Sequence, residues 1–255
     1  MIAYKTIIQS VNSFYDNIGP LYDIIYPNYE KIEAGLIKSL SQKKIINNNQ
    51  KILDVGCGSG YFLRELEKLN NNLVLTGLDI SKKSIANAII LTKKESKIRY
   101  KKEDIIEYNG DKFDVIVCLG NTLIHYPLLY QKKILNKLYT LLNSSGLLLI
   151  DIYKDWQKYF SDIKRFEPKG YKTNKLTYFS FIYTIGSKHY IKRNVCFAKY
   201  KNKKKQEMPF EFKQYVIKQY PFILDRNRRG LSFKDIEEVE LEDKLKLYKY
   251  FMLKK

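Results

Sequence analysis

The 255-residue sequence predicts an α/β fold, in which a doubly wound, mainly parallel sheet is followed by an antiparallel C-terminal cap. Three observations predict it. Short apolar runs alternate with amphipathic helical patterns as far as Asp151, and a glycine-rich turn joins the first of these runs to the next helix. Beyond Asp151 the pattern becomes strands with hardly a helix between them. Repeated strand-helix alternation is typical of a parallel sheet covered by helices on both faces.

The segment before the alternating part, residues 1–45, carries aromatic residues in a loose pattern and then one clear helical period. The apolar residues with helical spacing are Tyr29, Ile32, Leu36 and Leu40. A polar break follows at Asn47–Gln50, where we expect a loop. We interpret residues 1–45 as a lid segment that precedes the main domain.

The alternating part begins at Lys51 and supplies five expected strands and three expected helices. The strands are Lys51–Val55, Leu73–Asp79, Ile98–Lys102, Phe113–Leu119 and Gly146–Ile152. The helices are Tyr61–Leu69, Ser81–Lys93 and Leu128–Leu142. Ser81 is the expected N-cap of its helix, and a turn is expected at Asn143–Gly146. We therefore predict a Rossmann-like core over residues 46–155.

The remaining residues, 156–255, are expected to form the antiparallel cap and closing strands. The expected strands there are Tyr178–Ile185, Tyr190–Tyr200, Phe210–Tyr220 and Lys244–Leu253. Lys201–Gln206 is rich in lysine and lies between two of these strands, which is typical of a solvated hairpin tip.

The chain is strongly basic, with 46 Lys and Arg against 27 Asp and Glu, a net charge of +19. Such an excess favours association with polyanions. The excess is mostly lysine, however, and is scattered among abundant Ile, Asn and Tyr, which resembles a codon bias. We favour solvated surface over a nucleic-acid footprint.

The sequence contains no signal-peptide pattern at residues 1–10 and no apolar run of the roughly 20 residues that cross a bilayer. Its cysteines, Cys57, Cys118 and Cys196, are odd in number and widely spaced, so neither a disulfide framework nor a metal site is indicated. A cytoplasmic protein without a metal is expected, with Cys57 and Cys118 as packing residues.

The residues that carry the chemistry begin with Ile52-Leu53-Asp54-Val55-Gly56-Cys57-Gly58-Ser59-Gly60, a strand that enters a glycine-rich turn. Glycine allows unusual backbone angles and close approach of a ligand to the main chain. Asp79 follows about 20 residues later at the end of the next strand, where a carboxylate accepts hydrogen bonds from ribose hydroxyls. Asp104 follows the third strand and is expected to take an adenine amino group. These strand ends converge on one crevice.

The order of residues in this turn separates two nucleotide-binding classes. A dehydrogenase turn reads Gly-x-Gly-x-x-Gly and seats a diphosphate. Here the order is Asp-x-Gly-x-Gly-x-Gly, and the acid Asp54 would repel a diphosphate but can order the amino group of a methionine moiety. The expected cofactor is S-adenosylmethionine.

With Gly77-Leu78-Asp79-Ile80-Ser81, this turn resembles the nucleoside site of class I methyltransferases, and the resemblance covers residues 45–155. It implies transfer of a methyl group from S-adenosylmethionine. The residues expected to bind the cofactor are Tyr15, Lys31, Asp54, Gly56, Cys57, Gly58, Gly60, Asp79, Ile80, Asp104, Ile105 and Leu119.

A narrower resemblance follows at Cys118-Leu119-Gly120-Asn121-Thr122-Leu123-Ile124-His125, which is similar to a segment of glycine and sarcosine N-methyltransferases. The resemblance implies that Asn121 reaches substrate and that His125 lies near the methionine carboxylate. It also places Tyr15, Tyr26 and Lys31 in the segment that closes over the cofactor. The expected catalytic set is Asn121, His125, Tyr26, Tyr153 and Tyr220. A loop-capping role for His125 stays open.

The sequence departs from that family after the fifth strand, where the family has Asp-His-Arg-Asn-Tyr and uses the arginine to pair with the carboxylate of glycine. Here the same place reads Asp151-Ile152-Tyr153-Lys154-Asp155. Neither a tyrosine nor a lysine reproduces the bidentate geometry of arginine, so glycine is expected to be a poor substrate.

The sequence thus predicts an S-adenosylmethionine-dependent methyltransferase that acts on a small molecule, with N-methylation of an amine favoured. An RNA or protein methyltransferase is the alternative, supported by the net charge and by Lys201–Lys205. The absence of an Asn/Asp-Pro-Pro-Tyr motif after the fourth strand lowers that alternative. A nucleoside-binding interaction protein is a third hypothesis, against which Asp79 and Asp104 argue. The small-molecule acceptor is the expected partner; nucleic acid and self-association stay open.

Overall fold

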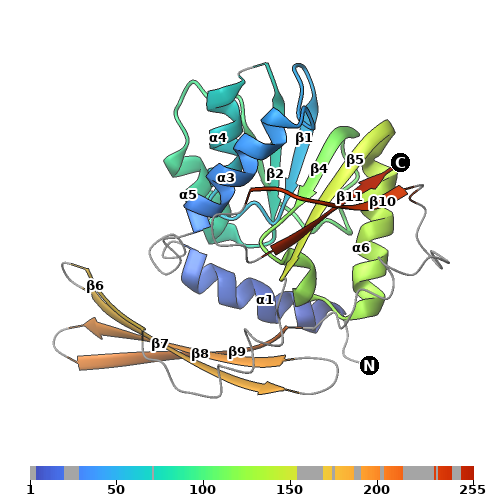
Figure 1. The fold of residues 1–255 in the computed structure, drawn as a ribbon. Coiled ribbons are helices and arrows are strands. Elements are labelled where there is room, and N and C mark those ends of the chain that lie inside the picture. Colours follow the sequence, from blue (N-terminus) through green and yellow to red (C-terminus); the bar gives the residue numbers. More distant parts are fainter. Residues whose placement is uncertain are drawn as a thin grey trace.

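The computed structural model describes residues 4–19, 29–70, 72–153, 169–173, 176–186, 191–201, 204–214, 233, 235–242 and 248–255. They form a seven-stranded sheet with the order β10-β11-β5-β4-β1-β2-β3 and a separate four-stranded sheet with the order β6-β7-β8-β9. Figure 1 shows helices packed around the larger sheet, and the smaller sheet beyond α1.

The parallel part of the larger sheet contains five strands. They are β1 (Lys51–Val55), β2 (Val74–Asp79), β3 (Arg99–Lys102), β4 (Phe113–Cys118) and β5 (Leu142–Tyr153). The chain proceeds from β1 outward to β3 and then crosses to β4 on the other side of β1. The strand order therefore reverses between β1 and β4, and ligands of open α/β sheets bind outside the carboxyl ends of strands at such a point.

Two antiparallel strands, β11 (Tyr248–Lys254) and β10 (Asp235–Val239), complete this sheet beside β5. The predicted α/β class, a mainly parallel sheet with antiparallel C-terminal strands, is confirmed. The predicted strand Lys244–Leu253 is described from Tyr248 onward, as β11, and residues 243–247 lie outside the described residues.

The helices are α1 (Tyr4–Ile18), α3 (Tyr29–Gln42), α4 (Tyr61–Leu69), α5 (Lys82–Leu91), α6 (Leu128–Leu141) and the short 3₁₀ helix η2 (Thr122–His125). The helix α1 was not foreseen as a helix. Its buried residues Ile7, Val11 and Phe14 have helical spacing, but the scattered tyrosines around them obscure this pattern in the sequence. The N-cap Ser81 is as predicted, and its hydroxyl accepts the N–H of Ser84 at 3.0 Å.

Buried side chains of the strands alternate between two cores, one on each face of the larger sheet. Ile52, Val115 and Leu149 pack with residues of α3 and α4, whereas Leu53 and Ile116 pack with residues of α6. Successive residues of a strand point to opposite faces, so both faces of these strands must be apolar. This explains the continuous apolar runs in the sequence.

The turn predicted at Asn143–Gly146 is instead part of β5, as an irregularity in its pairing with β4. Phe113 pairs with Leu142 and Val115 pairs with Leu147, so β5 has extra residues between these two pairs. Asp114 holds them: one of its carboxylate oxygens accepts Asn143 Nδ2 at 2.6 Å, and the other accepts the N–H of Lys51 at 2.8 Å. The turn-forming residues here produce a bulge within β5 and do not end the strand.

The smaller sheet consists of β6 (Lys169–Thr173), β7 (Leu176–Gly186), β8 (Ile191–Lys201) and β9 (Lys204–Gln214), all antiparallel. The prediction that Lys201–Gln206 forms a hairpin tip was too broad, because Lys204–Gln206 belong to β9 and pair with β8. Main-chain pairing does not depend on the lysine side chains. Residues 215–220, predicted to continue this strand, lie outside the described residues.

The smaller sheet meets the core through β9, which contacts α1 and η2. None of the described helices is both long enough and apolar enough to cross a bilayer.

Candidate functional site

The glycine-rich turn after β1 has the backbone geometry that its sequence predicts. Gly56, Gly58 and Gly60 have φ angles of +79°, +52° and +77°. The N–H groups of Gly56 and Cys57 donate to the carbonyl oxygen of Leu78 at 2.8 and 3.0 Å, which ties the turn to the end of β2. A Cβ atom at Gly56 would lie 2.6 Å from Oγ1 of Thr122, so glycine is required for close approach as well as for backbone angle.

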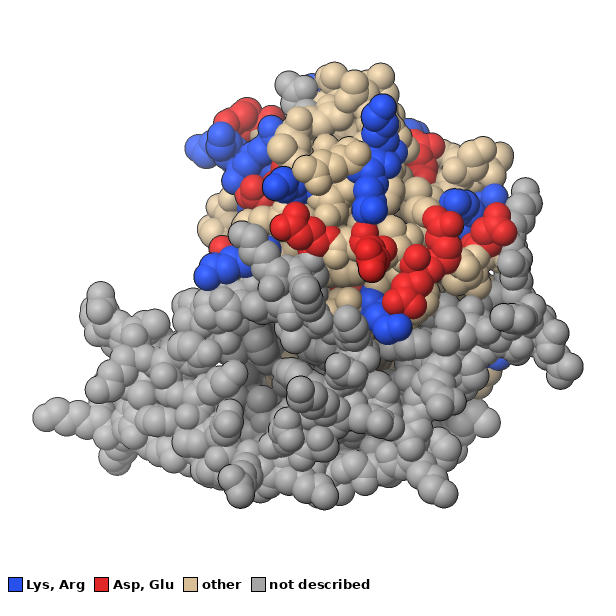
Figure 2. Space-filling model, in the orientation of Figure 1, with Lys and Arg blue, Asp and Glu red and all other residues tan. Residues whose placement is uncertain are grey.

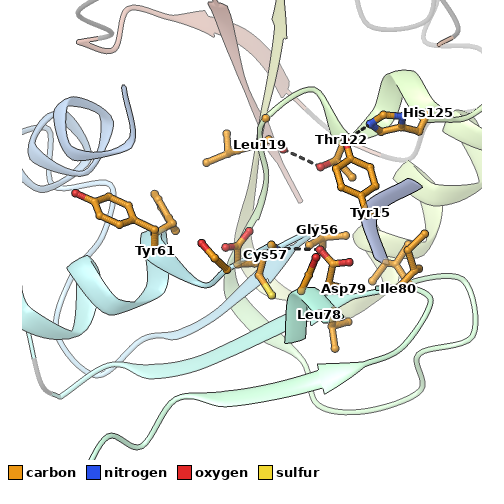
Figure 3. A pocket seen from close by; sticks show the side chains of 18 of the residues that line it. Tyr15, Gly56, Cys57, Tyr61, Leu78, Asp79, Ile80, Leu119, Thr122 and His125 are labelled. Carbon is orange, nitrogen blue, oxygen red and sulfur yellow. Dashed lines mark hydrogen bonds between the residues drawn. The ribbon is translucent and has the colours of Figure 1, made fainter. Parts of the chain in front are cut away.

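Asp79, the last residue of β2, faces this turn. One of its oxygens accepts the N–H of Gly58 at 3.0 Å, and the other accepts the N–H of Ser81 at 2.8 Å. A carboxylate has about four acceptor positions. These bonds fix its orientation and leave acceptor positions on both oxygens, as a pair of ribose hydroxyls requires. Figure 3 shows Asp79 beside Gly56 and Cys57.

Burial strongly affects the two aspartates at the base of the site. It raises the pKa of Asp54 to about 8, and the nearby charge of Asp79 adds to this effect. Burial also raises the pKa of Asp79, to about 6, although the N–H groups of Ser81 and Gly58 oppose the rise. Asp54 therefore holds a proton at neutral pH and Asp79 holds one below about pH 6, and a cationic ligand favours the ionised form of both.

The crevice over this turn has a volume of about 1070 Å³, its solvent-facing part included. Its lining comes from the carboxyl ends of β1, β2, β3 and β4 with the loops that follow them, and from α1, α3, α4, α5 and η2. The lining residues are Val11, Tyr15, Glu30, Glu33, Asp54, Val55, Gly56, Cys57, Gly58, Ser59, Tyr61, Phe62, Leu78, Asp79, Ile80, Ser84, Glu103, Ile105, Leu119, Gly120, Thr122, His125 and Tyr126.

Hydrogen bonds fasten α1 across the carboxyl ends of the strands. The hydroxyl of Tyr4 donates to the carboxylate of Asp104, after β3, with distances of 2.9 and 2.8 Å to its two oxygens. Asp16 accepts the hydroxyl of Ser81 at 2.8 Å and the N–H of Lys83 at 3.1 Å, after β2. These contacts hold α1 over the crevice.

A third contact joins α1 to the loop after β4. The hydroxyl oxygen of Tyr15 lies 2.8 Å from Nε2 of His125, and the two rings are perpendicular. Figure 3 shows this pair on one side of the crevice and Tyr61 on the other. Val11 and Tyr15 both line the crevice, and the lid role of residues 1–45 stays a prediction.

The structure brings most of the predicted site residues together. Those that line the crevice are Tyr15, Asp54, Gly56, Cys57, Gly58, Asp79, Ile80, Ile105, Leu119 and His125. The cysteines Cys57 and Cys118 are buried, as predicted for packing residues.

The other predicted site residues do not line the crevice, or their side chains are not among those that the structure describes. Lys31 is exposed on α3, Gly60 packs against Tyr100, and Asn121 is buried at the start of η2. Asp104 lies beside the crevice but accepts Tyr4 and the N–H of Ile106. Tyr26 and Tyr220 lie outside the described residues, and Tyr153 is described through its backbone in β5.

The crevice also contains residues that the sequence did not single out, including Glu30, Glu33, Tyr61, Glu103 and Thr122. Tyr61 could have been found, since it begins the helix directly after the glycine turn. The two glutamates of α3 could not, because their position depends on how α3 packs over that turn.

The described lining of the crevice is acidic, in contrast to the net charge of the chain. It contains Glu30, Glu33, Asp54, Asp79 and Glu103, and none of the described lining residues is Lys or Arg. On the outer surface, Figure 2 shows Lys and Arg interspersed with Asp and Glu over the described part of this face. The site therefore suits a cationic ligand.

The fold and site together define a class. The strand order, the glycine turn and the antiparallel strands beside β5 together give the fold of solved S-adenosylmethionine-dependent methyltransferases. A family model described as a methyltransferase domain matches residues 46–214. The chain belongs to this family and carries a methyltransferase domain whose cofactor is S-adenosylmethionine.

Curated relatives include two carboxy-S-adenosyl-L-methionine synthases. That of Nautilia profundicola is 29% identical over 133 residues, covering 46% of this chain and 56% of the relative. That of Campylobacter fetus is 25% identical over 166 residues, covering 60% and 68%. The match thus spans between about half and two thirds of these relatives.

Solved structures share the fold over nearly the whole chain. The sugar N-methyltransferase KedS8 from Streptoalloteichus has a TM-score of 0.70 at 14% identity, covering 92% of each chain. The amino pentose methyltransferase CalS10 from Micromonospora echinaspora, with S-adenosylmethionine bound, has a TM-score of 0.68 at 13% identity, covering 92% and 96%.

Proposed function

We propose that the protein transfers the methyl group of S-adenosylmethionine to the nitrogen of a small-molecule amine. The observation that carries the proposal is the acidic crevice. Five acidic residues line it, and none of the described lining residues is Lys or Arg. An aliphatic amine is a cation at neutral pH, so the crevice attracts it.

The same charges disfavour anionic acceptors. An acceptor with a carboxylate or phosphate would add a second anion to the methionine carboxylate of the cofactor, beside Glu30, Glu33 and Glu103 and with no Lys or Arg in the described lining. Burying an anion without a partner costs several kcal/mol. Glycine and RNA are therefore disfavoured as acceptors at the site, even if the basic surface of the protein attracts polyanions.

The reaction needs no nucleophilic side chain, because the sulfonium methyl group is already activated. The nitrogen lone pair forms a bond to the methyl carbon as the carbon-sulfur bond breaks, and the electron pair stays on sulfur. The protein holds the two reactants in line and excludes water, and α1 over the crevice supports both tasks.

The amine must lose a proton before it attacks. Tyr15 and His125 line the crevice and share a hydrogen bond, so this pair can accept that proton and pass it from oxygen to nitrogen. Among the residues named from the sequence, Asp79 keeps its proposed role at the ribose, and Asp54 keeps its proposed role at the amino end of the methionine moiety.

Two rival activities make different demands on the site. Production of a carboxy derivative of S-adenosylmethionine, named in the curated relatives, introduces another negative group next to Asp54. Methylation of RNA or protein requires a path for a polymer. The solved neighbours named for sugar N-methylation and amino pentose methylation agree better with a small amine.

An acceptor screen with charge-matched compounds tests the proposal. Purified protein and S-adenosylmethionine are incubated with amino sugars and the matching hydroxy sugars, with polyamines, with glycine and with transfer RNA. Mass spectrometry follows both the acceptor and the cofactor. Methylation of amines in preference to their hydroxy counterparts is expected. Methylation confined to hydroxyl groups or RNA, or conversion of the cofactor to a carboxy derivative, would overturn the proposal.

Charge-neutralising variants test the role of the carboxylates. Glu30→Gln and Glu33→Gln should raise KM for the amine with a smaller effect on kcat, because they act on attraction and not on chemistry. Glu65→Gln is the matched control, since Glu65 lies on α4, outside the crevice lining, and pairs with Lys68. An equal effect of all three variants would contradict a local role for Glu30 and Glu33.

A further inference from the structure

We infer that Asp151 is a positioning residue that sets the shape of the loop after β4, where this loop lines the crevice. The expected effect of Asp151 on turnover rests on the proposed function, whereas its effect on the conformation of the loop does not. Asp151 lies on β5, is buried, and is 5% exposed. Its two carboxylate oxygens accept the N–H groups of Gly120 and Asn121, each at 2.8 Å.

Both residues of this loop have a left-handed backbone, with φ of +67° at Gly120 and +58° at Asn121. A left-handed conformation is unfavourable for residues other than glycine and persists when the surroundings hold it. Successive main-chain N–H groups in such a turn converge on one point and attract an anion. Here the side chain of Asp151 occupies that point.

The requirement is for two acceptors side by side. An aspartate offers one oxygen to each N–H group, whereas an asparagine offers one oxygen and one NH₂ group. An asparagine at this position would therefore set a donor against one of the two N–H groups. The loop is therefore held by the two acceptor oxygens of the carboxylate, and an asparagine of the same shape cannot replace them.

The position of the loop matters because of what it carries. Gly120, Thr122 and His125 line the crevice, and Thr122 packs against the glycine turn at Gly56. The helix η2 begins directly after Asn121, so the backbone at that residue sets the direction of η2. A change at Asp151 should therefore move His125 relative to the cofactor turn.

Asp114 offers a matched control. It is also an aspartate of the central strands, and its two oxygens likewise accept a main-chain N–H and an NH₂ group, from Lys51 and Asn143. It is the second residue of β4, at the end of the sheet opposite to the crevice. Asp114→Asn therefore repeats the chemical change of Asp151→Asn away from the site.

The experiment compares Asp151→Asn with Asp114→Asn by amide hydrogen exchange, calorimetry and turnover. In Asp151→Asn, faster exchange confined to residues 119–126 is expected. Its Kd for S-adenosylhomocysteine should change by no more than about threefold, the range for substitutions away from direct contacts. Its kcat should fall by about tenfold to a hundredfold, as for a misplaced catalytic group. Asp114→Asn should leave residues 119–126 and kcat unchanged.

The outcomes separate this inference from the proposed function. Wild-type exchange over residues 119–126 in Asp151→Asn overturns the inference, whether or not an acceptor is known. If wild-type protein methylates no amine, the proposed function fails, and the exchange data still decide the role of Asp151. If Asp151→Asn does not fold, Asp151→Ser, which keeps one acceptor and adds no NH₂ group, is measured with the same expectations.

Discussion

The hydroxyl oxygen of Tyr15 lies 2.8 Å from Nε2 of His125, and this hydrogen bond connects α1 to the loop after β4. The two residues come from segments 110 positions apart in the sequence, and both face the crevice. This hydrogen bond thus joins the predicted lid segment to the proposed acceptor side of the site. A proton can also be transferred along it.

Replacing Tyr15 with Phe removes the hydroxyl but retains the ring. We expect kcat for amine methylation to fall by about a hundredfold, the lower end of the range for general acid-base groups. The Kd for S-adenosylhomocysteine should change little. Tyr4→Phe is the matched control on the same helix; because Tyr4 bonds to Asp104, it should alter cofactor Kd more than kcat. The same response of both variants would mean that α1 acts only as a lid.

Replacing Asp79 with Ala should weaken binding of S-adenosylmethionine and of its demethylated product by about 1.5 to 3 kcal/mol, the range for hydrogen bonds to a charged group. The expected loss is equal for the two ligands because both contain the ribose. Calorimetry measures it, and circular dichroism checks that the variant is folded. Unchanged affinity in a folded variant would falsify the role of Asp79.

Cofactor affinity should increase with pH between about 6 and 8. In the free protein the pKa of Asp54 is raised to about 8 and that of Asp79 to about 6, so binding of a cation at neutral pH must release protons. The increase is at most about tenfold per pH unit for each group. Calorimetry in buffers of different ionisation enthalpy counts the protons. Asp54→Asn should abolish the release between pH 7 and 8.

Asp54→Asn should also change the stability of the ligand-free protein, and here the change is an increase at high pH. The folded-state pKa of Asp54 lies above its ordinary value of 3.8, so its stabilising contribution is full below pH 3.8 and is lost as the pH rises through about 8. Asp54→Asn should therefore raise the Tm of the ligand-free protein at pH 8 and have less effect at pH 5. A lower Tm at pH 8 would show that the ionised carboxylate is stabilised in the free protein.

Glycine should be a poor acceptor, because the described lining of the crevice has no cation for its carboxylate and Tyr153 stands where the resembling family has an arginine. Its KM should be far above that of an amine without a carboxylate. Tyr153→Arg should lower KM for glycine, since arginine can pair with a carboxylate through two hydrogen bonds. Efficient turnover of glycine by the unmodified protein would contradict this prediction.

Binding of transfer RNA, where it is observed, should be non-specific and sensitive to salt. Association driven by phosphate contacts should weaken steeply between about 50 and 200 mM salt. Filter binding with a specific RNA and a scrambled RNA measures both features. Tight, sequence-selective binding that persists at the higher salt concentration would favour the RNA methyltransferase alternative over a small-molecule acceptor.

Much of the core was predictable because local sequence encodes it. Buried parallel strands require continuous apolar runs, and the turn after β1 requires glycine at positive φ, so these elements appear directly in the sequence. The helix α1 was missed since its apolar residues Ile7, Val11 and Phe14 are dispersed among tyrosines that interact with distant residues.

The sequence by itself determined the fold class, the glycine turn, the acid at the end of β2 and the expectation of S-adenosylmethionine, because each depends on residue spacing within one strand-helix unit. Only the tertiary structure decided which neighbouring acid lines the crevice: Glu103 does, whereas Asp104 bonds to Tyr4, 100 residues away. It also placed Glu30 and Glu33 in the lining and Asp151 under the loop. The physical reason is that such contacts join segments far apart in the chain, and packing of helices and neighbouring strands, not local periodicity, brings them together.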